Sequence, residues 1–314
     1  MDDKTLYLID GHSLTFKAYY AIRNLRSPQG APTGAVYGFL RMLLKFIGDY
    51  SPQWLAVVFD TGKPSFRKAL FQAYKANREA PPPDFSDQML QIYRLLKAMG
   101  IATYEQENFE ADDVIATIAE QLKPQGWQTV VLTADKDLLQ LGDGFVTVLR
   151  PGLNETRRCD AAAVEEVLGV RPDQVVDWLA LVGDSSDNIP GVPGIGEKSA
   201  VELLRRFGSL DAMLERAAEI PKPKQRAALL ENVERARLAQ VLATVRRDVP
   251  VAWELPCCRL PQDLWAGDTV ALLSELGFDS LIKEKGLKPP ASAPALAVAA
   301  AARGAGGPLC GDGG

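Results

Sequence analysis

Three short apolar runs in the first half of the chain alternate with longer segments of helical periodicity. The runs at residues 5–9, 54–59 and 129–132 are nearly continuous in β-branched, aromatic and aliphatic residues, which is typical of strands covered on both faces. The helices predicted between these runs span residues 33–50, 86–99 and 111–122. Strands and helices in alternation predict an α/β fold with a mostly parallel, doubly wound sheet flanked by helices.

From about residue 160 onward, the strand signal gives way to short helical patterns separated by glycine and proline. The helices predicted there span residues 161–168, 173–182, 197–207 and 225–246. After Gly286 the composition shifts to alanine, glycine and proline, as in flexible linkers. We therefore expect three parts: an α/β core over residues 1–160, a helical lobe over 161–287, and a flexible tail or linker over 288–314.

Each of the three predicted strands runs into an aspartate, namely Asp10, Asp60 or Asp135. Ligands of open α/β sheets bind outside the carboxyl ends of the strands, so these three side chains are expected to share one crevice. Any one of them alone is more simply a turn or helix-capping residue. Three at equivalent positions favour a common site.

Further acidic residues cluster at short spacing near these strand ends. They are Glu110, Asp112, Asp113, Asp137, Asp184 and Asp187. Nine carboxylates in one site would repel one another strongly, and divalent cations are the simplest way to neutralise them. One histidine, His12, and the absence of any C-x-x-C pair exclude the common zinc sites, so oxygen ligands select Mg²⁺ or Mn²⁺. A pair of such ions is the arrangement that hydrolyses phosphodiesters.

The segment that follows Asp60 is basic and aromatic, which suits a nucleic acid. Residues 63–78 carry five cations and no acid, with Phe66, Phe71 and Tyr74 interleaved as stacking surfaces. The formal net charge of −5 argues at first against such a partner. Without the nine clustered carboxylates, however, the rest of the chain is net positive, so the acidity is local.

A glycine-rich segment over residues 191–199 has the wrong spacing for a phosphate-binding P-loop, because Glu197 separates the second glycine from the lysine. It fits a tight turn between two helices, in which Gly194 and Gly196 let backbone amides approach a phosphate. Lys198 and Ser199 just inside the second helix favour that role, although a plain helix–helix turn without a ligand stays open.

Taken together, these motifs closely resemble the 5′ nuclease domain of bacterial DNA polymerase I, within the flap endonuclease superfamily. The matching motifs are Leu-Ile-Asp10-Gly, Val-Val-Phe-Asp60, Tyr74-Lys-Ala-Asn-Arg78, Glu110-Ala-Asp-Asp113, Thr-Ala-Asp135-Lys-Asp137 and the segment from Gly183 to Lys198. The resemblance covers residues 4 to 287. It implies a structure-specific 5′→3′ exonuclease and flap endonuclease of replication and repair, acting on DNA and on primer RNA paired to DNA.

The resemblance also assigns roles to individual residues. The ligands it implies for a first metal ion are Asp10, Asp60, Glu110 and Asp112, with Asp113 nearby. Those it implies for a second are Asp135, Asp137, Asp184 and Asp187. It places Tyr74, Lys75 and Arg78 in a helical arch, over about 63–85, that positions the scissile phosphate and the unpaired 5′ end. Residues 191–199 match a helix-hairpin-helix that grips the downstream duplex, often with K⁺.

The resemblance leads to further expectations about DNA contacts and partners. Lys17 stands where relatives commonly carry arginine, so a bidentate phosphate contact is expected to be weaker there. Arg67 is also expected to contact DNA. The polymerase region of relatives is missing, which leaves a stand-alone nuclease or the N-terminal part of a polymerase, with a polymerase as partner in cis or in trans. We expect a monomer of the bacterial cytoplasm at the nucleoid, with no membrane contact, since a secretory signal and long apolar runs are absent.

Two other functions remain open on the sequence alone. An acid-rich α/β phosphatase acting on small phosphoesters would explain the carboxylates but not the hairpin or the arch. A DNA-binding module without catalysis would explain the basic segments, but its nine carboxylates would repel the DNA backbone. Activity on a small monoester, or DNA binding that needs no divalent metal, would discriminate these alternatives.

Overall fold

The structure, a computed structural model, describes residues 4–152 and 156–288. Apart from Lys288, the tail or linker expected over 288–314 lies outside the described residues. None of the helices in the described residues combines the length and the apolar character that a membrane span requires.

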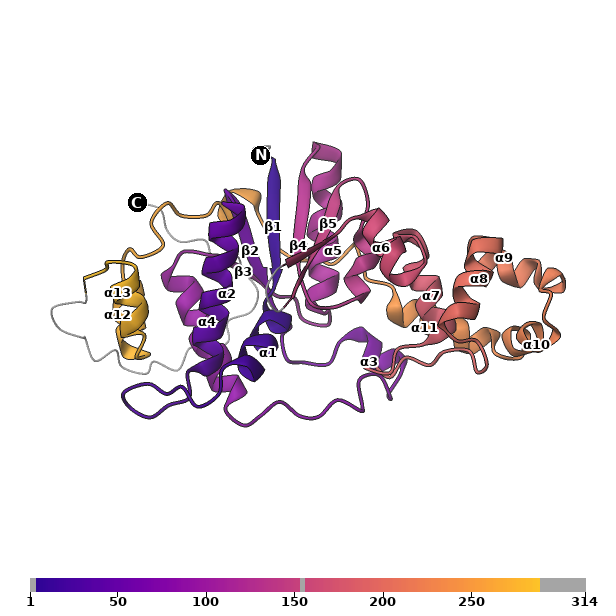
Figure 1. Ribbon diagram of the computed structural model, residues 1–314, viewed down its shortest axis with the longest axis horizontal. Coiled ribbons are helices and arrows are strands. Elements are labelled where there is room, and N and C mark those ends of the chain that lie inside the picture. Colours follow the sequence, from indigo (N-terminus) through magenta and orange to yellow (C-terminus); the bar gives the residue numbers. More distant parts are fainter. Residues whose placement is uncertain (1–3, 153–155, 289–314) are drawn as a thin grey trace. The chain divides into compact units, whose positions relative to one another are not determined.

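Six strands form one mostly parallel sheet, in the order β3-β2-β1-β4-β5-β6 (Figure 1). The pairs β1–β2, β2–β3 and β4–β5 are parallel, whereas β5 and β6 are antiparallel. The strands are β1 (Thr5–Asp10), β2 (Trp54–Val58), β3 (Ala102–Tyr104), β4 (Gln128–Leu132), β5 (Val146–Pro151) and β6 (Thr156–Cys159). The predicted α/β class with a mostly parallel sheet and flanking helices is therefore confirmed.

By its internal contacts the chain divides into two compact units. The first comprises the residues up to 61, residues 80–106 and those from 250 onward; the second comprises residues 62–79 and 107–249. This division follows packing, whereas the boundary expected at residue 160 follows the order of the chain.

The first unit contains strands β1 to β3 and their helices. These helices are α1 (Gly11–Ala21), α2 (Gly34–Tyr50), α4 (Phe85–Ala98), the 3₁₀ turn η5 (Leu255–Cys258), α12 (Thr269–Glu275) and α13 (Asp279–Glu284). The interior of the strands is fully buried, as the continuous apolar runs predict, with Leu8, Phe39 and Ile92 among the side chains without solvent contact. This core holds the carboxyl ends of β1 and β2, where Asp10 and Asp60 lie.

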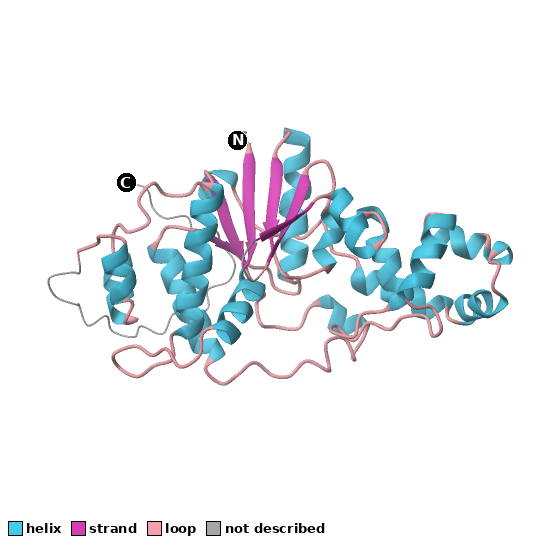
Figure 2. Cartoon of the chain, viewed as in Figure 1, coloured by secondary structure: helices cyan, strands magenta, loops and turns pink. Residues whose placement is uncertain are grey.

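The second unit contains strands β4 to β6, with helices α7 to α11 gathered away from them (Figure 2). Its helices are α3 (Phe66–Leu70), α5 (Ala111–Leu122), α6 (Ala161–Leu168), α7 (Val175–Val182), α8 (Glu197–Phe207), α9 (Leu210–Glu215), α10 (Pro223–Glu231) and α11 (Val233–Ala243). Its 3₁₀ turns are η1 (Lys123–Gln125), η2 (Asp137–Leu141), η3 (Pro172–Gln174) and η4 (Ala217–Glu219). A shared apolar core that includes Trp178, Leu204 and Leu242 joins α7, α8 and α11.

The segment expected as a helical arch is mostly irregular. Within residues 63–85, helix is limited to α3 and the first residue of α4, and residues 72–77 are turns. Lys75 lies at the centre of these turns with a positive φ of 53°, a conformation that directs the chain sharply toward the loop at Asp187. The amide of Lys75 donates to the carbonyl of Asp187 at 2.9 Å, which fixes that approach.

Candidate active site

The strand ends of the first unit place two of the predicted ligands. Asp10 ends β1 and caps α1, and its Oδ1 accepts the amide of Ser13 at 2.9 Å. Asp60 follows β2, and its amide donates to Nδ1 of His12 at 3.1 Å. Burial lowers the pKa of His12, with Asp60 and Glu105 opposing, so the imidazole is a neutral acceptor that orients the Asp60 backbone. Lys17 lies partly buried on α1, and burial lowers its pKa.

The N-terminus of α5 carries three of the predicted ligands, and the structure gives them different environments. Glu110 is the helix N-cap, and its carboxylate accepts from Ser65 Oγ at 2.9 Å and from Lys75 Nζ at 2.8 Å. Burial would raise the pKa of Glu110, but Lys75 and Arg67 outweigh it and the pKa lies below its usual value. Asp112 is partly exposed in the same helical turn.

Asp113, in contrast, is fully buried and has a structural role. Its two oxygens accept both terminal nitrogens of Arg67 at 2.7 and 2.8 Å, the amide of Arg246 at 2.8 Å and the amide of Glu110 at 3.0 Å. These four donors fill the acceptor sites of a carboxylate, so none is left for a metal ion. Arg67, 2% exposed, is likewise held inside the protein and does not offer its charge to DNA.

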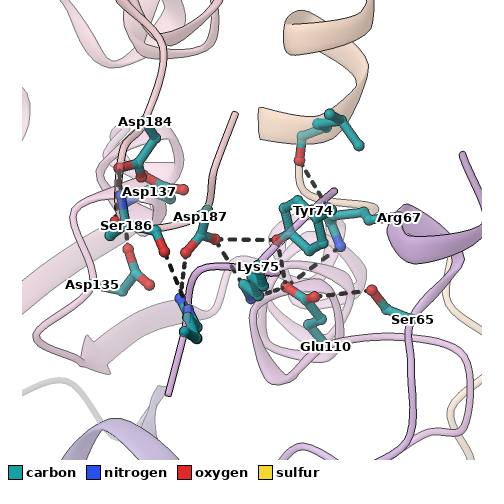
Figure 3. A network of polar contacts seen from close by, with 12 residues as sticks. Ser65, Arg67, Tyr74, Lys75, Glu110, Asp135, Asp137, Asp184, Ser186 and Asp187 are labelled. Atoms are coloured by element: carbon teal, nitrogen blue, oxygen red, sulfur yellow. Dashed lines mark hydrogen bonds and ion pairs between the residues drawn. The ribbon is translucent and has the colours of Figure 1, made fainter. Parts of the chain in front are cut away.

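The four remaining predicted ligands gather at two loops of the second unit (Figure 3). Asp135 and Asp137 follow β4, and the amide of Asp137 donates to Asp135 at 2.9 Å. Asp184 and Asp187 follow α7, in a loop closed by the pair of hydrogen bonds between Asp184 and Ile189. Asp137, Asp184 and Asp187 are all buried.

Basic residues of the expected arch lie directly on these carboxylates. Lys75 Nζ lies 2.8 Å from Glu110 and 3.5 Å from Asp187, and Arg78 pairs with Asp187. The hydroxyl of Tyr74 lies 3.1 Å from both Glu110 and Asp187, so it joins the two groups of acids (Figure 3). Burial and then these two acids raise the pKa of Tyr74, which keeps the phenol protonated.

Negative charge is only partly compensated at the second group of acids. Burial raises the pKa of Asp135, and it raises that of Asp137 well above its usual value together with the charges of Asp135, Asp184 and Asp187. Asp184 is the exception, because Ser186 and Lys136 outweigh burial and lower its pKa. The group therefore has an excess of negative charge that a cation would relieve.

The donor chemistry of this group fits a divalent metal ion. Asp137 Oδ1 is buried and has no hydrogen-bond partner among the described residues, and its neighbours are carboxylate oxygens, the ligands that Mg²⁺ prefers. Within residues 4–152 and 156–288, no three acidic, histidine or cysteine side chains already form a ligand cage. In this part of the chain the cationic groups of Lys75, Arg78 and Lys136 pair instead with Glu110, Asp187 and Asp184.

The predicted hairpin forms as a turn before α8. Gly194 has a positive φ of 87°, and Gly196 is the N-cap of α8. Lys198 is exposed in the first turn of the helix, and Ser199 accepts a hydrogen bond from Gln225 at 2.9 Å. The exposed helix N-terminus with its adjacent lysine has the properties of an anion site.

Sequence reasoning did not single out several residues of this site. Lys136 lies between two predicted ligands and pairs with Asp184 at 3.2 Å, and Ser65 contacts Glu110. The lysine could have been found from its position, whereas a lone serine or a buried glutamine such as Gln140 gives no signal in the sequence.

Acidic groups with basic side chains placed among them are typical of enzymes that use divalent metal ions in phosphoryl transfer. Residues 5–169 match the family model of the 5′-3′ exonuclease N-terminal resolvase-like domain, and residues 170–263 that of the 5′-3′ exonuclease C-terminal SAM fold. The chain therefore belongs to the 5′-3′ exonuclease family.

Curated relatives support this assignment. DNA polymerase I of Bacillus caldotenax is 42% identical over 283 residues, which are 90% of this chain and 32% of that protein. The thermostable DNA polymerase I of Thermus aquaticus is 40% identical over 280 residues, 89% of this chain and 33% of that protein. The chain spans about a third of the length of these relatives.

Solved structures share the fold at low sequence identity. The T5 D15 protein co-crystallised with metal ions has a TM-score of 0.65 and 21% identity, covering 89% of this chain and 97% of that one. The catalytic core of Rad2 in complex with DNA substrate has a TM-score of 0.56 and 19% identity, covering 90% and 91%.

Proposed function

We propose that this chain cleaves 5′ flaps, nicked strands and 5′ ends of DNA, and primer RNA paired to DNA, with two Mg²⁺ ions that Mn²⁺ can replace. The observation that carries the proposal is the buried, unpartnered oxygen of Asp137 within the second group of acids, next to the cations of Lys75 and Arg78. Cleavage of 5′ ends and flaps is also supported by the relatives and structural neighbours, which include DNA polymerase I, a 5′-exonuclease and a flap endonuclease.

The ligand set that we propose omits Asp113, whose oxygens are already occupied. Asp135, Asp137, Asp184 and Asp187 would hold one ion, some of them through water. Glu110 and Asp112 would be ligands of the other ion, for which the resemblance also implies Asp10 and Asp60. When bound, the ions supply Lewis acidity toward the phosphate and lower the pKa of water.

The side chains of the arch supply binding and orientation. Lys75 and Arg78 now neutralise Glu110 and Asp187, and both carry fixed positive charge, because those acids outweigh burial and raise the pKa of each. We propose that these cations turn to the oxygens of the scissile phosphate when metal and DNA bind. Tyr74 stays protonated and donates a hydrogen bond that holds Glu110 and Asp187 in place.

The exposed hairpin is the part that we propose for the downstream duplex. The amides at the start of α8 and the ammonium of Lys198 would contact backbone phosphates, with Gly194 and Gly196 permitting close approach and K⁺ as a possible bridging ion. Lys17 is a further phosphate contact on this proposal. We also propose a monomer of the bacterial cytoplasm, acting at the nucleoid with a DNA polymerase in cis or in trans.

The test is cleavage of labelled 5′-flap, nicked and blunt duplexes in Mg²⁺. We expect the flap to be cut fastest, chelation to abolish cutting, and Asp135→Asn to abolish cutting while flap binding persists. Asp177→Asn is the control, because Asp177 is a buried acid that accepts hydrogen bonds from Leu210 and Gln240. Undiminished turnover by Asp135→Asn would remove it from the ligand set, and activity in chelator would refute the metal requirement.

A further inference from the structure

The segment 242–249, which leaves the end of α11, is held by buried side chains of other elements. Residues 244–249 have no regular secondary structure. The last carbonyls of a helix lack partners within the helix and must find them elsewhere. In this protein the partners come from α3, α5 and η2, all of which also carry or contact the proposed metal ligands.

Arg67 of α3 is the first of these partners. Its Nε donates to the carbonyl of Leu242 and its terminal nitrogen to that of Thr244, both at 2.8 Å. A guanidinium at a helix C-terminus also complements the helix dipole. The same Arg67 forms the bidentate pair with Asp113, and Asp113 in turn accepts the amides of Arg246 and Glu110. One end of the segment is thus linked through Arg67 and Asp113 to the backbone amide of Glu110.

Gln140 of η2 is the second partner, and it faces the other group of acids. Its Nε2 donates to the carbonyl of Ala243 at 2.9 Å and to that of Asp137 at 2.8 Å, while its Oε1 accepts the amide of Val245 at 3.1 Å. All three hydrogen bonds are buried. The carboxamide therefore links the backbone of a proposed metal ligand directly to the segment.

Thr117 of α5 holds the far end of the segment. Its hydroxyl donates to the carbonyl of Asp113 at 2.8 Å and accepts the amide of Val249 at 3.1 Å. Val245 and Val249 are buried as well. Apolar packing and hydrogen bonds therefore both hold the segment in one position. A continuous path of hydrogen bonds and main chain runs from the Glu110 amide through Asp113, residues 243–246 and Gln140 to the Asp137 carbonyl.

We infer that Gln140 is a positioning residue, which uses the 242–249 segment as a strut to set the spacing between the Glu110 group and the Asp137 group of carboxylates. Tyr74 and Lys75 also join the two groups, but the proposed reaction requires Lys75 to change partners. The strut uses no group that the substrate or the metal needs, so it can keep the spacing constant while the arch residues move. The positions of metal ligands must be held to within about 0.5 Å. Loss of a hydrogen bond that supports a ligand commonly weakens metal binding by about 10–100-fold.

This inference rests on the proposed function, and metal binding tests it independently of cleavage. Gln140→Met keeps the volume but loses all three hydrogen bonds. We expect calorimetric titration of the metal-free chain with Mn²⁺ to show about tenfold weaker binding, and kcat on the flap to fall by a similar factor while KM changes less than about twofold. If that variant does not fold, Gln140→Asn carries the test, because its shorter amide cannot reach Ala243 and Asp137 together.

Gln174 provides the matched control within the same unit. It is equally buried, donates to the carbonyls of Leu204 and Gly208 at the end of α8, and accepts the amide of Arg171, remote in the hydrogen-bond network from the acids. We expect Gln174→Met to lower the melting temperature as much as Gln140→Met does, with Mn²⁺ affinity unchanged.

The results distinguish a failure of the proposed function from a failure of the proposed role of Gln140. A wild-type chain that neither binds Mn²⁺ nor cleaves the flap refutes the proposed function. A wild-type chain that does both, beside a Gln140→Met variant with wild-type Mn²⁺ affinity, refutes the strut alone. An equal loss of Mn²⁺ affinity in Gln174→Met also refutes it, because the effect would then follow from stability and not from position.

Discussion

At the scale of single residues, Arg67 and Asp113 form an ion pair with almost no solvent contact, and each also satisfies backbone groups. Removing the guanidinium leaves a buried Asp113 carboxylate that has lost two donors, and it leaves the carbonyls of Leu242 and Thr244 without that partner. We expect Arg67→Met to lower the free energy of unfolding by about 3–5 kcal/mol, measured by urea denaturation. Arg157→Met, which removes an exposed pair with Glu166, is expected to change it by less than about 0.5 kcal/mol. Equal effects would contradict a structural role for the buried pair.

Asp137 leads to a prediction of the opposite kind, because in the absence of metal its negative charge is expected to destabilise the folded chain. A carboxyl with a raised pKa binds its proton more tightly in the folded than in the unfolded chain, so its stabilising contribution is present at low pH and lost as pH rises through the raised pKa. Asp137 should therefore lower the melting temperature of the metal-free chain as pH rises above about 4, which a pH series of thermal melts measures, whereas His12, whose pKa is lowered, acts in the opposite direction as pH rises through about 6.5.

The variant Asp137→Asn isolates that contribution. We expect it to raise the melting temperature of the chelated protein near neutral pH, to flatten the pH dependence, and to remove stabilisation by Mn²⁺. Asp177→Asn should not raise the melting temperature, because Asp177 accepts two hydrogen bonds and lies outside the group of acids. A lower melting temperature for Asp137→Asn in chelator would contradict the charge excess.

For single residues, the sequence predicted the type of side chain in the site better than it predicted the hydrogen-bond and ion-pair partners of each side chain. Aspartates at strand ends and their short spacing identified the acids, because turns and strand ends are recognisable locally. Whether an acid faces a metal or a buried arginine depends on residues distant in the chain: Asp113 meets Arg67 and Arg246. For the same reason the sequence could not distinguish Asp113 from Asp112, or reveal Gln140.

At the scale of elements, the loop that carries Asp184 and Asp187 is closed by two glycines. A Cβ on Gly191 would lie 2.2 Å from the carbonyl oxygen of Val182, and one on Gly183 2.5 Å from the amide of Gly191. We expect Gly191→Ala to destabilise the chain by about 2 kcal/mol or more and to weaken Mn²⁺ binding, as calorimetry and denaturation would show. Gly144→Ala, where a Cβ meets nothing within 4 Å, should change neither.

Helices were predicted well where the helical pattern of apolar residues extends over many residues. Helices α2, α4 and α5 lie within about one residue of the predicted ranges, and α6 and α8 match them. The single helix expected over 225–246 is two helices, α10 and α11, separated at Asn232. Strands β3, β5 and β6 were not predicted. β3 has only three residues and β6 is polar, so their pairing depends on neighbouring strands and not on a local pattern.

At the scale of the whole molecule, a formal net charge of −5 must be reconciled with the polyanionic substrate that we propose. If metal ions neutralise the acids, they also remove repulsion toward DNA, so the two ligands must assist each other's binding. We expect Ca²⁺, which has the right charge but looser geometry than Mg²⁺, to raise flap affinity about tenfold over chelator without fast cleavage. Fluorescence anisotropy of a labelled flap measures this directly.

Linkage adds a second, independent measurement, because flap DNA must then raise the affinity for Ca²⁺ by the same factor. Both factors should shrink as salt rises, since screening weakens the repulsion that metal removes. Lys198→Ala is the control: it should weaken flap binding equally in chelator and in Ca²⁺, because the hairpin contacts the duplex and not the acids. Equal flap affinity with and without Ca²⁺ would show that the acids do not face the DNA.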